Sequence, residues 1–69
     1  MKRFSVTRFG KNLRKQRKEN GLSQEELALS AELDRSYVGG IERGERNPSL
    51  NVILQLAAAI GIEPKEFFQ

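Results

Sequence analysis

The sequence contains no cysteine, no histidine and no tryptophan. Disulfide bonds and zinc sites built from Cys and His are therefore excluded. There is also no glycine-rich phosphate-binding loop and no acidic cluster with metal-ligand spacing, so we expect no enzyme activity, no metal and no cofactor. A 69-residue chain without such crosslinks has a core worth only about a few kcal/mol of net stability, which favours self-association.

Long apolar runs are missing as well. No segment approaches the roughly 18 apolar residues of a membrane span, and the first ten residues lack the apolar centre of a signal peptide. We therefore expect a cytoplasmic protein with no membrane partner.

Positive charge is concentrated at the start of the chain. Residues 1–18 contain eight Lys or Arg and no acid, whereas the remaining residues contain four cations and nine anions. This segregation is compatible with a surface that binds a polyanion, and equally with a solvated helix face.

Residues that typically start or end helices recur along the chain, and they predict an all-α fold. Five short helices are expected, over residues 7–19, 24–31, 35–43 and 50–60, with a short last helix beginning near Pro64. Ser5 or Thr7 caps the first helix, and Ser23 forms a capping box with Glu26. The predicted core positions, which lie on one face of each helix, are Phe9, Leu13, Leu27, Ala28, Ala31, Val38, Ile41, Leu50, Ile53, Leu56, Ala57 and Ile60.

Only residues 32–34 join the second and third helices. So short a link is typical of a helix-turn-helix, here over about residues 23–43, in which the second of the two helices enters the DNA major groove. A plain helical hairpin has the same spacing, so the spacing alone leaves both interpretations open.

Several sequence motifs carry a family resemblance. They are GLSQEELA at residues 21–28, IERG at 41–44, NPSL at 47–50 and LAAAIGI at 56–62. With these motifs, residues 8–68 resemble the Cro/repressor, or Xre-like, helix-turn-helix family. The resemblance implies a compact five-helix, lambda-repressor-like domain that binds double-stranded DNA. Within the family, the short chain and its Arg35-Ser36-Tyr37 segment are most similar to the controller proteins of restriction–modification systems.

The first turn of the third helix is the predicted base-reading segment. Arg35 can donate two hydrogen bonds to a guanine, and Ser36 is small enough to approach a base or a thymine methyl. Tyr37 offers a ring and a hydroxyl to bases or phosphates, although a half-buried core position is an equal alternative. For Arg35 the alternative is an exposed side chain or an ion pair with Glu32.

Contacts to the DNA backbone are predicted from four further residues besides Tyr37. They are Gln24, at the start of the second helix, and Arg43, Arg46 and Asn47, at the end of the third helix and in the loop after it. For Arg46, a contact to a base is the alternative. The family resemblance implies that Arg17 and Glu42 form a structural ion pair between the first and third helices.

Three residues near the predicted recognition helix are unusual. Gly39 and Gly40 each weaken a helix by about 1 kcal/mol relative to alanine, and they permit either close approach of DNA or tight helix packing. In the family, the position of Gly40 often carries a base-contacting side chain. Glu32 stands where the family usually has glycine, and a left-handed residue there costs roughly 1–2 kcal/mol, so a reshaped turn is expected.

The fourth helix is apolar almost all round, which predicts a dimer interface over the helices at about residues 49–68. The expected interface residues are Val52, Leu54, Ala58, Ile62 and Phe67, with Phe68 as the alternative to Phe67 and Ala59 as a further apolar position that needs cover. A monomer with scattered exposed apolar residues is the alternative.

These features together predict a homodimeric transcriptional regulator on a palindromic operator. The controller resemblance implies control of a restriction–modification operon, including the protein's own gene, as activator, repressor or both. RNA polymerase is a further expected partner, through Glu25 and Glu26. The alternative is an antitoxin-type or phage-type repressor whose main role is binding a protein partner.

Overall fold

The computed structural model describes residues 4–69, which fold into four α-helices and a final 3₁₀ turn. The elements are α1 (Val6–Glu19), α2 (Gln24–Ala31), α3 (Arg35–Glu42), α4 (Leu50–Ile60) and η1 (Pro64–Phe68). The all-α class is therefore confirmed, whereas the expectation of five helices is corrected, because the last element is a single 3₁₀ turn. None of these helices is long and apolar enough to cross a membrane.

The helix starts follow from side-chain caps. Ser5, not Thr7, caps α1 by accepting from the Arg8 backbone N–H at 3.1 Å, so α1 begins one residue before the predicted start. The capping box of α2 is complete: Ser23 Oγ accepts from the Glu26 N–H at 3.0 Å, and the Glu26 carboxylate accepts from the Ser23 N–H at 2.8 Å. Because these are local contacts, the sequence placed the starts of α2, α3 and α4 correctly.

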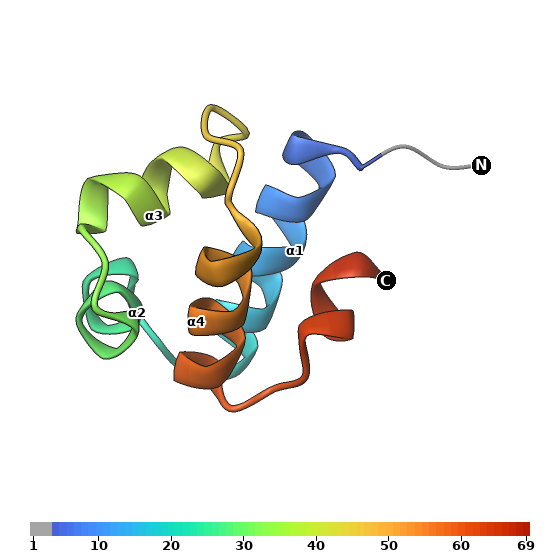
Figure 1. The fold of residues 1–69 in the computed structure, drawn as a ribbon. Coiled ribbons are helices and arrows are strands. Elements are labelled where there is room, and N and C mark those ends of the chain that lie inside the picture. Colours follow the sequence, from blue (N-terminus) through green and yellow to red (C-terminus); the bar gives the residue numbers. More distant parts are fainter. Residues whose placement is uncertain (1–3) are drawn as a thin grey trace.

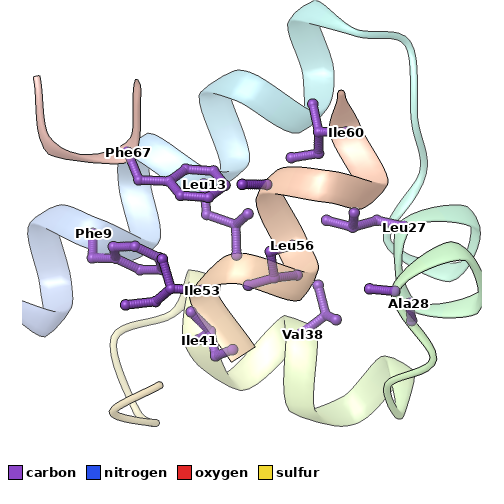
Figure 2. Packing of buried hydrophobic residues seen from close by; sticks show 12 residues of the cluster. Phe9, Leu13, Leu27, Ala28, Val38, Ile41, Ile53, Leu56, Ile60 and Phe67 are labelled. Atoms are coloured by element: carbon purple, nitrogen blue, oxygen red, sulfur yellow. The ribbon is translucent and has the colours of Figure 1, made fainter. Parts of the chain in front are cut away.

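The helices pack around α4, with α2 and α3 on one side of it and the C-terminal turn on the other (Figure 1). Side chains from every element meet between them (Figure 2). The buried apolar residues are Phe9, Leu13, Leu27, Ala28, Ala31, Val38, Ile41, Ile53, Leu56, Ala57, Ile60 and Phe67. All but the last were predicted core positions, since helical periodicity identifies a buried face well.

Leu50 is the one predicted core position that the structure contradicts. Its side chain is 70% exposed, because it lies at the first residue of α4 and one turn before Leu54, which is also exposed. These two residues and Ala58 are spaced four apart, and so they follow one stripe along the outside of α4.

Helix α1 and the end of α3 approach each other closely at Gly10. A Cβ atom added to this glycine would overlap with the carbonyl oxygen of Ile41 and lie 2.8 Å from that of Glu42. The absence of a side chain therefore lets the two helices meet backbone to backbone. This contact helps to set the position of α3 relative to the rest of the fold.

Candidate nucleic-acid interface

The turn between α2 and α3 keeps a left-handed residue, although that residue is not glycine. Glu32 adopts φ 59° and ψ 42°, and the N–H of Leu33 donates to the carbonyl of Ala28 at 2.8 Å. The expectation of a reshaped turn is therefore wrong. Glu32 takes the conformation that glycine usually takes, at a cost of about 1–2 kcal/mol.

The amino end of α3 is held by a cap and carries exposed side chains. Asp34 accepts hydrogen bonds from both the backbone N–H of Ser36, at 2.9 Å, and its hydroxyl, at 2.8 Å. These hydrogen bonds hold the pKa of Asp34 below its ordinary value, and the bond from the Ser36 hydroxyl has the larger effect. Arg35 and Ser36 are exposed, whereas Tyr37 is half-buried and packs against the core. Arg35 makes no ion pair with Glu32 within residues 4–69.

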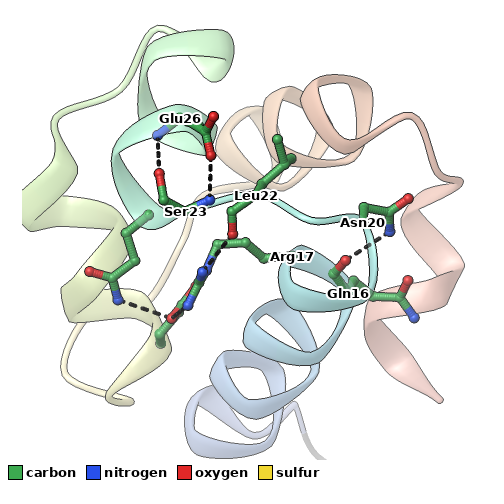
Figure 3. A network of polar contacts seen from close by, with 8 residues as sticks. Gln16, Arg17, Asn20, Leu22, Ser23 and Glu26 are labelled. Atoms are coloured by element: carbon green, nitrogen blue, oxygen red, sulfur yellow. Dashed lines mark hydrogen bonds and ion pairs between the residues drawn. The ribbon is translucent and has the colours of Figure 1, made fainter.

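A buried polar network fixes α3 to the two preceding helices (Figure 3). Arg17 donates to the Glu42 carboxylate through Nε at 2.6 Å and Nη2 at 3.0 Å, and to the carbonyl of Leu22 through Nη1 at 2.8 Å. The side chains of Arg17 and Glu42 are only 8% and 3% exposed, respectively. The structure thus brings together the pair that the family resemblance implied.

Gln24 joins the same network. Its side-chain N–H donates to Glu42 Oε1 at 3.0 Å, which fixes the orientation of the amide at the first residue of α2. Sequence reasoning missed this contact, because residues 24 and 42 lie on different helices and no local pattern links them. The contact anchors a residue that was predicted to face a phosphate.

Two glycines on α3 are covered by other side chains. Gly39 and Gly40 are both buried. A Cβ on Gly39 would lie 3.0 Å from Arg43 Nη1, and one on Gly40 would lie 2.8 Å from Arg46 Cγ. Arg43 also forms an exposed ion pair with Glu45 at 3.1 Å, and ion pairs of this kind contribute little to folding stability. The glycines are therefore overlaid by the two arginines from the end of α3 and the following loop.

Comparison with known proteins places this arrangement in a family. Residues 13–67 match the helix-turn-helix family. The chain belongs to it.

Several relatives of this helix-turn-helix chain are named control or controller proteins. It is 47% identical over 62 residues to control protein C.MunI of a Mycoplasma species, which covers 88% of this chain and 84% of that protein. It is 42% identical over 59 residues to control protein C.BamHI of Bacillus amyloliquefaciens, with coverage of 84% and 73%. Among solved structures, the restriction-modification controller protein C.AhdI from Aeromonas hydrophila is 59% identical, with a TM-score of 0.89 and coverage of 91% of this chain and 96% of that one.

The predicted interface residues of this helix-turn-helix protein divide into three groups. Leu54 is 45% exposed and Ala58 is also exposed, whereas Val52 and Ile62 are half-buried against the core. Phe67 has no exposed surface, so its assignment to a dimer interface is wrong. Its ring packs on Phe9 with the ring centroids 5.1 Å apart, while the neighbouring Phe68 is 52% exposed.

The sequence could not decide between these two phenylalanines. Both follow Pro64 in the last short element, and only the tertiary structure shows which of them points inward. Asn12 holds this element in place by donating from its side chain to the carbonyl of Phe67 at 2.7 Å. Within residues 4–69 there is no group of acidic residues that could hold a metal ion.

Proposed function

We propose that this protein is a sequence-specific DNA-binding transcriptional regulator that acts as a homodimer on a palindromic operator. The observation that carries the proposal is the exposed first turn of α3. There Arg35 and Ser36 project from a helix whose position is fixed by the buried Arg17–Glu42 pair and by Gln24. A rigid support of this kind is what base reading needs, because hydrogen bonds to base edges tolerate little displacement.

The first turn of α3 reads bases in this proposal. Arg35 donates its paired N–H groups to guanine O6 and N7, worth about 1–3 kcal/mol of discrimination. Ser36 has its hydroxyl proton directed to Asp34, so its oxygen remains an acceptor for a base amino group. Tyr37 is half-buried, so we assign its hydroxyl a hydrogen bond to a base or a phosphate at the edge of the reading surface.

Phosphate contacts come from the start of α2 and from the end of α3 with the loop after it. Gln24 lies at the start of α2, where the free backbone N–H groups of a helix favour an anion. Arg43, Arg46 and Asn47 are exposed at the end of α3 and in the following loop. Arg43 and Asn47 bind the DNA backbone and so set the register of α3 on the duplex, while Arg46 binds the backbone or a neighbouring base.

The outer stripe of α4 supports dimer formation. Leu50, Leu54 and Ala58 form a continuous apolar strip, and Ile62 lies just beyond the end of the helix. A two-fold axis through such a strip pairs it with itself, and a dimer of this kind reads a palindrome when its two copies of α3 lie about 34 Å apart, one turn of DNA. The interface then consists of Leu50, Leu54 and Ala58, with Val52 and Ile62 at its edges.

The controlled genes are inferred from the relatives. Three similar proteins are named as controllers or control proteins, one of them explicitly of restriction-modification. We therefore assign this regulator to a restriction–modification operon that includes its own gene. RNA polymerase is the further partner we propose, through Glu25, which is exposed beside the capping box.

Selection of bound sequences from random duplexes tests the DNA-binding proposal. We expect an inverted repeat to be enriched. Arg35→Ala should then lose about 1–3 kcal/mol of preference at one guanine per half-site, whereas Gln24→Ala should weaken all sites about equally. An unchanged sequence preference after Arg35→Ala would refute the role of this side chain.

Sedimentation of Leu54→Glu tests the dimer. The buried charge should leave a folded monomer whose operator affinity is strongly reduced. Leu29→Glu is the matched control, because Leu29 is 81% exposed on α2 and is not part of the α4 stripe, so this variant should leave the dimer intact. A wild-type chain that sediments as a monomer at high micromolar concentration would contradict the dimer.

A further inference from the structure

Gly40 is buried on the outer face of α3. It follows Ser36 by four residues, and residues with this spacing lie on the same face of a helix. Ser36 is exposed, as expected for this face, yet Gly40 is not. The atoms that cover it belong to Arg46: a Cβ on Gly40 would lie 2.8 Å from Arg46 Cγ, 3.8 Å from its Cβ and 3.7 Å from its Nε.

The Arg46 side chain, from its Cβ to its Nε, therefore lies over Gly40. The residue as a whole remains exposed, so the cover over Gly40 is also part of the outer surface. Within residues 4–69, no hydrogen bond or ion pair occupies the Arg46 guanidinium. By contrast, Arg17 is bound to Glu42 and Arg43 to Glu45. Arg46 thus presents donors one turn along the helix from Ser36.

We propose that Gly40 is a specificity-determining position that works through Arg46. The missing side chain at residue 40 lets Arg46, from the loop after α3, lie across the helix and take the place of a recognition-helix side chain. Its planar guanidinium then recognises a guanine through O6 and N7. This inference rests on the proposed DNA-binding function and deepens it, because it names a second guanine-reading group in addition to Arg35.

The contact is sensitive to a single carbon atom. Real Cβ atoms essentially never approach another heavy atom as closely as 2.8 Å, so a side chain at residue 40 must displace Arg46. Because Cγ lies next to the root of the side chain, relief requires rotation about the first side-chain bond, which swings the guanidinium away. Alanine itself suits a helix better than glycine, so Gly40→Ala should fold.

A double-mutant cycle tests this coupling. Operator affinity is measured for Gly40→Ala, Arg46→Ala and the double variant, on the selected duplex and on duplexes with each guanine replaced. We expect Arg46→Ala to lose about 10- to 100-fold on the selected duplex, together with its preference at one guanine. Gly40→Ala should lose about 10-fold and the same preference, and the double variant should bind no worse than Arg46→Ala alone.

Two controls accompany the cycle. Gly39→Ala adds the same carbon to the neighbouring residue, where it meets only the flexible tip of Arg43 at 3.0 Å and the Gln24 amide beyond 3.4 Å. It should keep the base preference, with less than a threefold change in affinity. Gly40→Ser adds a Cβ at the same point as Gly40→Ala and should reproduce its loss, and thermal unfolding verifies that each variant is folded.

The possible results are distinguishable. If Gly40→Ala leaves affinity and base preference unchanged, or if the two losses multiply in the double variant, the coupling is overturned while the DNA-binding function stands. If the wild-type chain itself shows no preference among duplexes, the proposed function fails as well.

Discussion

Gly10→Ala should destabilise the fold, although alanine is the better helix former. Gly10 is buried in the second turn of α1, against the carboxyl end of α3. The atoms that a Cβ would meet are the carbonyl oxygen of Ile41 and the carbonyl oxygen and carbon of Glu42, the last two at 2.8 and 3.1 Å. All three are backbone atoms, so no side-chain rotation relieves the overlap and the two helices must move apart.

The magnitude follows from two opposed effects. Replacing glycine by alanine in a helix interior stabilises by about 1 kcal/mol. Overpacking a dense contact costs about 1–3 kcal/mol, and an overlap with backbone belongs at the upper end. Moving α3 also loosens the buried Arg17–Glu42 pair, which lies at the same junction. The net loss should be about 2 kcal/mol, which lowers the Tm of a domain this small by about 8–16 °C.

Thermal and urea unfolding followed by circular dichroism measure this loss. Wild type and variant are compared at equal concentration, because dimer formation makes Tm depend on concentration. Gly39→Ala serves as the control: its Cβ meets only side-chain atoms, so it should be neutral or stabilising by up to about 1 kcal/mol. A Gly10→Ala variant as stable as wild type would refute the backbone-contact reasoning.

Three further changes test other parts of the structure. Glu32→Gly should raise the free energy of unfolding by about 0.5–1 kcal/mol, because relief of the left-handed strain exceeds the entropy cost of glycine; a loss in urea unfolding would contradict this. Glu42→Ala should destabilise by about 3–5 kcal/mol, because Arg17 is left buried without its partner, and an effect below 1 kcal/mol would show that water replaces the carboxylate. Because hydrogen bonds from Ser36 lower the pKa of Asp34 in the folded state, their stabilisation is present above the ordinary value of 3.8 and is lost as the pH falls further; the acid limb of a pH–stability curve should be shallower in Asp34→Asn.

Several features were predictable from the sequence because they depend on neighbours along the chain. Capping residues such as Ser23 and Asp34 act within one helical turn, so the bounds of α2 and α4 and the start of α3 were placed correctly. Helical periodicity identified the buried positions for the same reason. Periodicity wrongly predicted that Leu50 is buried. It shows which side of a helix a residue lies on, but not whether another segment covers the first residue of α4.

The contacts that hold the site together were less predictable. Gln24 and Glu42 meet only because two helices pack at one angle, and Arg46 reaches Gly40 only because the intervening loop folds back. The sequence presented Gly39 and Gly40 as an anomaly with two explanations, DNA approach or helix packing. The structure shows a third, in which side chains from the end of α3 and beyond lie over them.

The amino-acid order alone determined the helices, their buried faces and a candidate reading segment, since each depends on residues within a few positions of one another. Tertiary packing alone decided which phenylalanine of the last turn points inward, how closely α1 meets α3, and which arginines remain available on the outer surface. Such decisions depend on distances between segments far apart in the chain, and these distances are defined only once the whole core has closed.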